Sequence, residues 1–174
     1  MKVIKIILVN IYITHGILIF SQDVKRNFAY FEFGGNGILN SLNYERLLFI
    51  NEKQSFRFSS RIGTGFYKST DSGPIVMTVP LELLIWLGKS KFHPEFGLGY
   101  TPSFGKRTYI KNNIIYKQTN FDYNLLFRIG IRFQSYNDRF LVKLGLTPVV
   151  YRDYYDNSKT KMMLWGGISM GIGF

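Results

Sequence analysis

The sequence predicts an all-β protein: an eight-stranded antiparallel up-and-down β-barrel that crosses a membrane, with a polar, salt-bridged lumen and a signal peptide before it. Three observations carry this prediction. Eight segments of about ten residues alternate between apolar and polar positions with the period of two that a strand imposes. One row of each segment is aromatic or aliphatic, and the opposite row gathers charged residues and glycines. The connections between segments are alternately short and long.

The composition agrees with a barrel of this kind. The 174 residues suit one domain, and 17 glycines with 17% aromatic residues favour crowded strands. Mean hydropathy is near zero, which argues against a bundle of membrane helices but suits a barrel with one apolar and one polar face. The sequence has no cysteine, which excludes disulfides and Cys-ligated metals. The net charge of +11 is scattered over strand ends, loops and inner positions, so we predict no nucleic-acid partner and no cofactor.

The first 21 residues have the pattern of a secretory signal peptide. Lys2 and Lys5 precede an apolar stretch, Ile6–Phe20, and the small residue Ser21 follows it. An uncleaved anchor is the alternative, but polar residues interrupt this short stretch, whereas spanning takes roughly 20 apolar residues. The expected organisation is a signal peptide at 1–21 and a β-barrel domain at 22–174.

The first four expected strands are Phe28–Gly37, Leu39–Phe49, Ser55–Tyr67 and Ile75–Leu87. Gly35-Asn36-Gly37 can supply the positive φ of a tight turn between the first two strands. The second strand loses its alternation near Arg46, at an interface or at a bulge. The third strand alternates most regularly. The fourth contains Pro80, which lacks a ladder donor and predicts a bulge or a bend.

The last four expected strands are Phe92–Pro102, Phe121–Gln134, Arg139–Tyr151 and Met162–Phe174. The segment Ser103–Asn120 is polar and irregular, and it can contain extensions of its flanking strands, since Ile114–Tyr116 is strand-like. In the final strand, Ile168, Met170, Ile172 and Phe174 form an apolar row that is expected to face lipid. Ser169 and the glycines at 167, 171 and 173 are expected to line the lumen. This strand should pair with the first one, which closes the barrel.

The charged row decides which face is inside. If the glycines and charges pointed outward, the Phe, Leu, Ile and Val rows would overfill the interior of a soluble barrel with an apolar cavity. If this row points inward, glycine leaves room for long charged side chains. Four Glu then face four Arg and one Lys, so that a salt-bridged, plugged lumen is expected. The lumen set comprises Glu32, Glu45, Arg57, Arg61, Glu82, Glu95, Arg128, Arg132 and Lys143.

Connection lengths support the same orientation, because membrane barrels have short turns on one side and longer loops on the other. The second, fourth and sixth connections are short: Asn51–Lys53, Gly88–Lys91 and Ser135–Asp138. The third, fifth and seventh are longer: Lys68–Pro74, Ser103–Asn120 and Tyr151–Thr160. The first, near Gly35–Asn40, should be long and is tight, which indicates that the first strand is misplaced.

Together, the strand count, the GxG motifs at 63–65, 97–99 and 171–173, and the terminal Phe174 resemble the small Gram-negative outer-membrane β-barrel proteins of the OmpA/OmpX-like eight-stranded superfamily. The resemblance covers about 28–174. It implies residence in the cell outer membrane, contact with outer-membrane lipid and lipopolysaccharide, and assembly machinery that reads Phe174 as part of its signal. The superfamily includes adhesins, stabilisers, conduits and a few enzymes, so it specifies architecture better than function.

The expected function is a non-enzymatic barrel with a structural or surface-contact role and no open pore. One alternative is a conduit for a small hydrophobic or anionic solute, with a gap in the wall marked by Pro80, Pro102 or Pro148. Another is a lipid-modifying enzyme that uses His93 and Glu95, which share a strand face. No serine stands beside His93 at a matching spacing, and a structural histidine is favoured.

Other candidate sites are weaker. The arginines at 57, 61, 128 and 132 could bind an anionic solute, but internal pairing with the four Glu is favoured. Lysines 106, 111 and 117 with Arg107 could meet lipopolysaccharide or simply be solvated. The tyrosines at 151, 154 and 155 suit an interface belt or a contact surface. One histidine after residue 21 and scattered carboxylates do not form a metal site.

Overall fold

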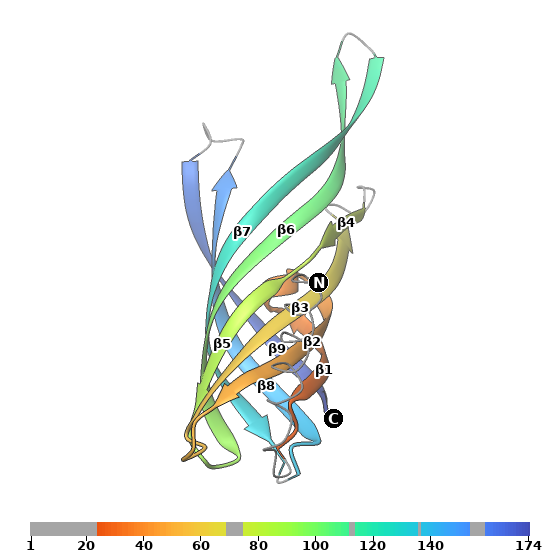
Figure 1. Ribbon diagram of the computed structural model, residues 1–174. Helices are drawn as coiled ribbons and strands as arrows, with labels where there is room; N and C mark the ends of the chain where they lie inside the picture. Colours follow the sequence, from red (N-terminus) through yellow and green to blue (C-terminus); the bar gives the residue numbers. More distant parts are fainter. Residues whose placement is uncertain (1–23, 69–74, 112–113, 136, 154–158) are drawn as a thin grey trace, which may run out of the picture.

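The computed structural model describes residues 24–68, 75–111, 114–135, 137–153 and 159–174, and the side chains of these residues except 106–111, 114–120, 151–153 and 159. These residues form a barrel of antiparallel strands (Figure 1). The elements are β1 (Asn27–Gly34), η1 (Gly35–Gly37), β2 (Asn40–Ile50), β3 (Phe56–Lys68), β4 (Ile75–Thr78), β5 (Leu81–Leu87), β6 (Phe92–Lys111), β7 (Ile114–Gln134), β8 (Phe140–Asp153) and β9 (Lys159–Gly173). No helix among the described residues has the length and hydropathy needed to cross a bilayer.

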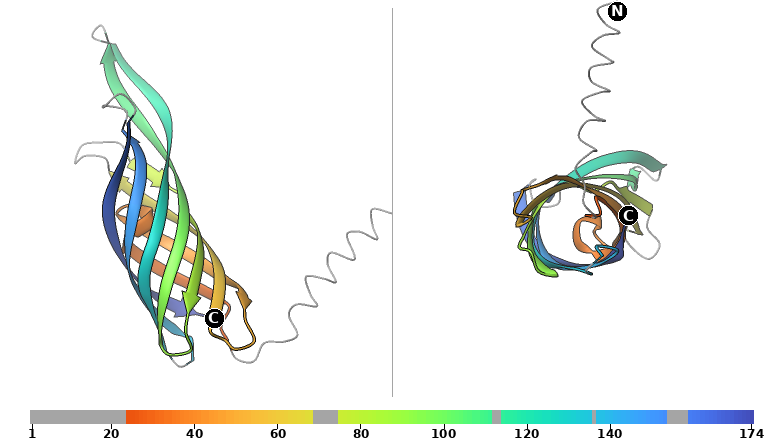
Figure 2. Two further views of the ribbon diagram at one scale, coloured as in Figure 1. Left: turned by 90° about the vertical axis from the view of Figure 1, so that its left-hand side faces the viewer. Right: turned by 60° about the horizontal axis from the view of Figure 1, so that its bottom comes forward.

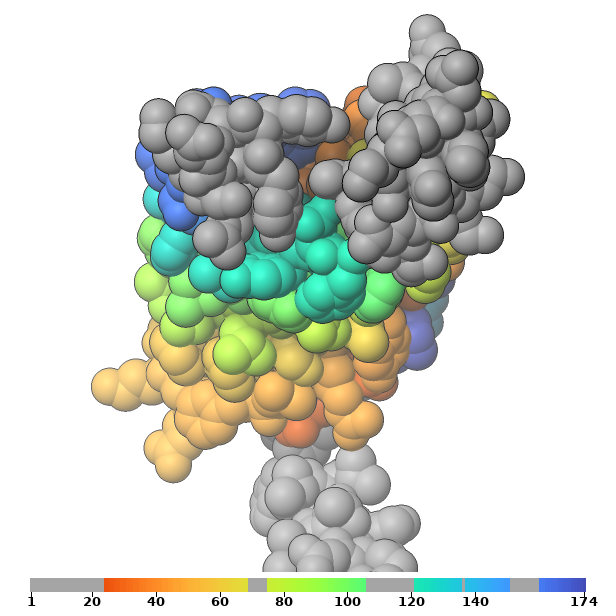
Figure 3. Space-filling view, turned by 90° about the horizontal axis from the view of Figure 1, so that it is seen from above, coloured from red at the N-terminus to blue at the C-terminus, as the bar shows by residue number. Residues whose placement is uncertain are grey.

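The barrel closes between its first and last strands, as the sequence predicts. Each strand pairs antiparallel with its sequence neighbours, and β1 pairs with both β2 and β9, with Phe31 opposite Met170. Closure gives each strand of the barrel wall a partner on both sides, whereas the described part of the β6–β7 hairpin beyond Phe104 and before Leu125 pairs only within itself. Seen from above, the surface colours follow the strand order from β2 and β3 to β7 (Figure 3).

β4 and β5 are two halves of one strand, so the barrel has eight strands. The break falls at Val79-Pro80, because proline has no N–H to donate to the ladder. Against β3, the register continues unchanged from Gly65–Thr78 to Ile62–Leu81, and Pro80 still accepts a hydrogen bond from Gly63 N at 2.8 Å. Of the bulge or bend expected at Pro80, the bulge is absent, and the strand is interrupted between Thr78 and Leu81 without a change of register.

The break in alternation expected near Arg46 is a β-bulge one to three residues later. The register of β2 against β3 shifts between Leu47 and Phe49. Phe49 and its neighbour Leu48 are both exposed, as a bulge allows. The pattern had located this irregularity correctly.

The long hairpin of β6 and β7 corrects the boundaries of the fifth and sixth strands. The segment Ser103–Asn120 was expected to be largely irregular with room for extensions of its flanking strands, and those extensions fill most of it: β6 continues to Lys111 and β7 begins at Ile114, paired throughout. The strand-like Ile114–Tyr116 belongs to β7. The hairpin rises well above the other strands (Figure 1). We refer to this side as the long-hairpin end, and to the side with the connections near 51–55, 88–91 and 135–139 as the short-turn end.

The tight first connection is explained by a turn that folds into the barrel. β1 ends at Gly34, three residues before the expected end, and Gly34, Gly35 and Ile38 all have positive φ. Gly34, η1 and its Asn36 are buried, and η1 contacts β3, β6 and β8 as well as its neighbours. In the view from the short-turn end, this orange segment lies inside the ring of strands (Figure 2, right).

The strand faces divide as predicted. In β9, Ile168, Met170 and Ile172 are exposed on the outer face, whereas Ser169 is buried inside. Outward aliphatic and aromatic side chains form a continuous apolar wall. The interior has an apolar cluster at the short-turn end, formed by Phe28, Tyr30, Leu47, Trp86 and Leu141. Above that cluster the interior is mainly polar, although Leu84, Leu126 and Val149 are also buried.

Candidate functional site

The nine charged residues predicted to line the lumen all lie inside the barrel, and each is at most 8% exposed. They come from seven of the strands, because the alternation of each strand turns every second side chain inward. Eight of the nine form two separate ion-pair rings. Each ring contains two carboxylates and two cations.

The first ring joins Glu32, Arg61, Glu82 and Arg128 in a closed cycle. Arg61 bonds both Glu32 and Glu82, and its Nη1 lies 2.7 Å from Glu82 Oε2. Arg128 completes the cycle, with Nη2 2.5 Å from Glu32 Oε1 and Nε 2.8 Å from Glu82 Oε1. Asn43 Oδ1 accepts further bonds from Arg61 at 2.8 and 3.0 Å. Buried charges are tolerated only when they are paired in this way.

The second ring joins Glu45, Glu95, Arg132 and Lys143. Arg132 Nη1 lies 2.6 Å from Glu45 Oε1 and 3.2 Å from Glu95 Oε2. Lys143 Nζ bridges the same carboxylates at 3.0 and 2.9 Å. The Tyr30 hydroxyl donates to Glu45 Oε2 at 3.1 Å. Both rings carry no net charge, so the whole set is neutral apart from one arginine.

That remaining arginine, Arg57, lies outside both rings. Its Nη1 donates to the Gly88 carbonyl at 2.8 Å, and its guanidinium lies 4.8 Å from the Trp86 ring centroid. Arg132 approaches the same ring at 4.0 Å and the Phe28 ring at 4.7 Å. Aromatic faces therefore contact both cations, in addition to the bonds that each cation makes.

Glycines make room for the rings. A Cβ on Gly97 would lie 2.8 Å from Glu82 Oε1 and 3.2 Å from Arg128 Cβ, and a Cβ on Gly63 would lie 2.1 Å from Asn43 Oδ1. A larger residue at Gly97 would push a ring member aside, and one at Gly63 would displace the Asn43 side chain that bonds Arg61. This agrees with the prediction that inner glycines leave space for long side chains.

The inward turn at Gly34–Leu39 covers the rings toward the long-hairpin end. Side chains from three distant strands hold its backbone. Trp165 Nε1 donates to Ile38 O at 2.9 Å, Thr101 Oγ1 donates to Asn36 O at 3.2 Å, and Thr78 Oγ1 donates to Gly37 O at 3.3 Å. The lumen is thus filled in layers by the apolar cluster, two charged rings and a turn.

Sequence reasoning missed two of these layers. The inward turn had no signal beyond the unexpectedly short first connection. Trp86 and Phe28 were placed on no face, although Trp86 follows Glu82 and Leu84 at the period of two and is therefore an inner residue. The alternation could have identified it.

The residues of the other candidate sites either do not form a common site or lie outside the described residues. His93 and Glu95 both face inward, but His93 Nδ1 lies 3.1 Å from the Leu87 carbonyl oxygen and its ring contacts Trp86, whereas Glu95 belongs to the second ring. Their geometry is that of structural residues. Within the described residues, no group of three or more His, Asp or Glu side chains could hold a metal ion. Residues 1–23, Tyr154, Tyr155 and the side chains of Tyr151, Lys106, Arg107, Lys111 and Lys117 lie outside the described part.

Comparison with known proteins gives a match at the level of structure. No protein-family model matches the sequence, and no curated protein matches it either. The crystal structure of the N-terminal β-barrel domain of Pseudomonas aeruginosa OprF superposes with a TM-score of 0.52 at 14% identity. The match covers 88% of this chain and 98% of that one. The chain therefore shares the fold of that domain, a closed, eight-stranded antiparallel β-barrel.

Proposed function

We propose that the protein is a non-enzymatic integral outer-membrane barrel that has a structural or surface-contact role and conducts no solute. Residues 1–21 serve as its signal peptide and 22–174 as its barrel domain. The observation that carries this proposal is the pair of neutral ion-pair rings, which occupy the lumen between an apolar cluster and an inward turn.

The outer surface supports a membrane position. Two bands of aromatic side chains bound the aliphatic wall, as the interfacial girdles of membrane barrels do. At the long-hairpin side, Tyr100 contacts Tyr123 at 5.7 Å and Phe104 contacts Phe121 at 5.3 Å between ring centroids. The band at the short-turn end comprises Phe49, Phe56, Phe92, Phe133, Phe140 and Phe174. In the proposed orientation, the short-turn end faces the periplasm.

The filled lumen supports the absence of conduction. Separating a buried ion pair leaves an uncompensated charge, which costs about 3–5 kcal/mol. A solute would have to open both rings and displace the turn held by Trp165, Thr101 and Thr78. The prolines that were candidates for a gap in the wall stay within the ladder: Pro102 O accepts from Val79 N at 3.0 Å, and Pro148 is paired opposite Leu164. The remaining roles are then contacts with lipopolysaccharide, outer-membrane lipid and other surfaces. In addition, the assembly machinery recognises Phe174.

Fractionation and conductance test the proposal together. We expect the protein to fractionate with the outer membrane, to migrate faster in unheated than in boiled SDS samples, and to give no conductance steps in planar bilayers. Recovery as a soluble periplasmic protein would refute the membrane assignment. Regular conductance steps that vanish when Arg128 and Arg132 are substituted would refute the closed lumen and favour the conduit.

A further inference from the structure

The apolar outer wall contains one polar row at the short-turn end. The ladder places Asn27 of β1 opposite Arg46 of β2, and Arg46 opposite Ser60 of β3. All three face outward, because the residues that alternate with them, such as Phe28, Glu45 and Ser59, are buried inside. Tyr44 adds its hydroxyl, which donates to Asn27 Oδ1 at 2.7 Å. Within this row, the side chains offer a guanidinium, an amide and hydroxyls and no carboxylate.

Arg46 is the feature that needs a partner. Its side chain is exposed, and among the described residues it makes no hydrogen bond or ion pair. It is also the only charged residue among the described side chains that face outward from strand interiors. In lipid, an Arg on the outer face of a barrel costs up to roughly 2–4 kcal/mol, less near the interface. A guanidinium in that position favours an anionic oxygen, and phosphate matches its planar donor geometry.

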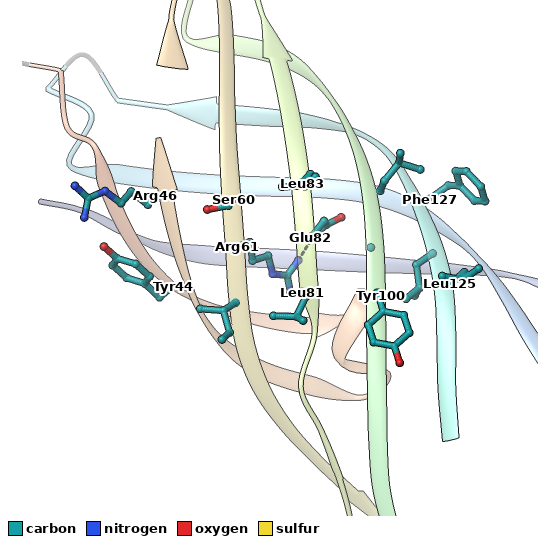
Figure 4. A pocket seen from close by; sticks show the side chains of 14 residues that line it. Tyr44, Arg46, Ser60, Arg61, Leu81, Glu82, Leu83, Tyr100, Leu125 and Phe127 are labelled. Carbon is teal, nitrogen blue, oxygen red and sulfur yellow. Dashed lines mark hydrogen bonds and ion pairs between the residues drawn. The ribbon is translucent and has the colours of Figure 1, made fainter. Parts of the chain in front are cut away.

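A groove in the wall begins beside this row. Its volume is about 710 Å³, and Tyr44, Arg46 and Ser60 line one side of it (Figure 4). The other side is aliphatic and aromatic, lined by Ile62, Leu81, Leu83, Leu98, Leu125 and Phe127. The volume is in the range of roughly 300–1,000 Å³ that small-molecule sites occupy. A ligand that fits both parts has an anionic head and an apolar chain.

The position of the polar row determines which end of the ligand lies near the short-turn end. Asn27 lies at the short-turn rim, where its N–H and C=O bond the backbone of Phe174. The tilted strands carry the ladder row upward from Arg46 through Ser60 and Leu83 to Leu98 and Phe127. The described rim also has a basic excess, with Lys25, Arg26, Lys53, Lys89 and Lys91 against Glu52, while the neighbouring charges of Asp138 and Arg139 offset each other. The head group therefore belongs at the rim and the acyl chain deeper in the membrane.

We propose that the wall between β2 and β7 is a binding site for one glycerophospholipid, with its phosphate at Arg46, Ser60 and Asn27 and one acyl chain in the groove lined by Leu83 and Leu98. The proposal rests on the proposed function, because the site needs the apolar wall to lie in a bilayer. In that orientation, the lipid belongs to the periplasmic leaflet. The phosphate contact favours this lipid over a lipid that has the same acyl chains and no phosphate.

Native mass spectrometry of the full protein, released from detergent, tests the site. The lipid probe is dioleoylphosphatidylglycerol, and dioleoylglycerol is the matched lipid that lacks the phosphate. We expect the wild type to retain one phosphatidylglycerol and little dioleoylglycerol. Arg46→Gln should reduce retention by about tenfold or more, since it removes a charged hydrogen-bond donor. Leu98→Trp, which fills the groove, should reduce retention as well, and Arg139→Gln at the rim should leave it unchanged.

Three results would overturn the proposal: equal retention by wild type and Arg46→Gln, an equal loss with Arg139→Gln, or a wild-type dimer that excludes lipid and separates when Arg46 is replaced. The last result would assign the groove to a second copy of the chain. Each variant is first checked for heat-modifiable migration, which reports the folded barrel independently of lipid retention. If the wild type inserts into vesicles but Arg46→Gln retains as much lipid as the wild type, the lipid site is refuted and the proposed function is not. If the wild type does not insert, the proposed function fails.

Discussion

Replacing Arg128 by methionine should destabilise the barrel strongly. The guanidinium of Arg128 contacts Glu32 at 2.5 Å and Glu82 at 2.8 Å, and these side chains are at most 1% exposed. Methionine keeps much of the volume but leaves two carboxylates to share Arg61. Removing one partner of a buried ion pair costs about 3–5 kcal/mol, and we expect a loss of unfolding free energy in that range.

Two comparisons separate ring pairing from general damage. Arg57→Met removes a lumen arginine that belongs to neither ring and has one hydrogen bond, to Gly88, so it should cost about 1 kcal/mol. The double variant Arg128→Met, Glu82→Leu leaves the neutral pair of Arg61 and Glu32. It should therefore be more stable than Arg128→Met by about 2 kcal/mol, an interaction of the size expected between coupled residues.

Urea unfolding in lipid vesicles gives the measurement, followed by tryptophan fluorescence and by the shift between folded and unfolded bands. Trp86 is buried inside the barrel and reports the loss of lumen packing. If Arg128→Met costs less than about 1 kcal/mol and the double variant gains nothing, water replaces the lost partner and the ring is not a sealed network. That result would remove the main support for a closed lumen.

Three further predictions test other parts of the barrel. Gly97→Val should lower the melting temperature measured by circular dichroism, because its Cβ would meet Glu82 Oε1 at 2.8 Å, whereas Gly166→Val, whose nearest neighbour is at 3.5 Å, should be tolerated. Equal effects would contradict the steric reasoning. Phe174→Ala should reduce the outer-membrane level of the protein in cells while changing its unfolding free energy in vesicles by less than about 1 kcal/mol, because Phe174 is 57% exposed; an unchanged level would argue against a role in assembly. Burial raises the pKa of Asp138 in the last short turn, so the protonated carboxyl favours the folded state and stability falls as pH rises through that pKa. Asp138→Asn should remove this decline in urea titrations between about pH 3 and pH 7, and an unchanged pH profile would assign it to another group.

The alternation of side chains predicted much of the fold and the membership of the lumen site. All eight strands exist, and the inner position of residues such as Glu32 and Arg128 follows directly from the period of two. The partners within the rings could not be predicted. Glu45 lies opposite Arg61 in the β2–β3 ladder, yet it bonds Arg132 and Lys143 from the far side of the barrel. A strand pattern specifies a face, but the pairing across a lumen depends on tilt and side-chain length.

The errors come from backbone features that carry little pattern. The inward turn depends on positive φ at Gly34, Gly35 and Ile38 and on side chains from remote strands. The long hairpin was obscured by polar residues, because a strand that extends beyond an apolar environment need not alternate. At Pro80, the missing N–H predicted a distortion, but the carbonyl kept its ladder bond to Gly63 and the register was preserved.

The arrangement of charges supports the proposal that the protein acts through its outer surface. A path through the lumen requires both rings to open, and even one uncompensated charge at about 3–5 kcal/mol leaves the open state populated at roughly one part in 10² to 10⁴. In the proposed function, these inner charges serve internal pairing. Arg46 differs from every ring member, since it faces outward and has no partner among the described residues. Where eight buried charges are paired within neutral rings, the unpaired one on the outer wall is where a ligand gains most from binding.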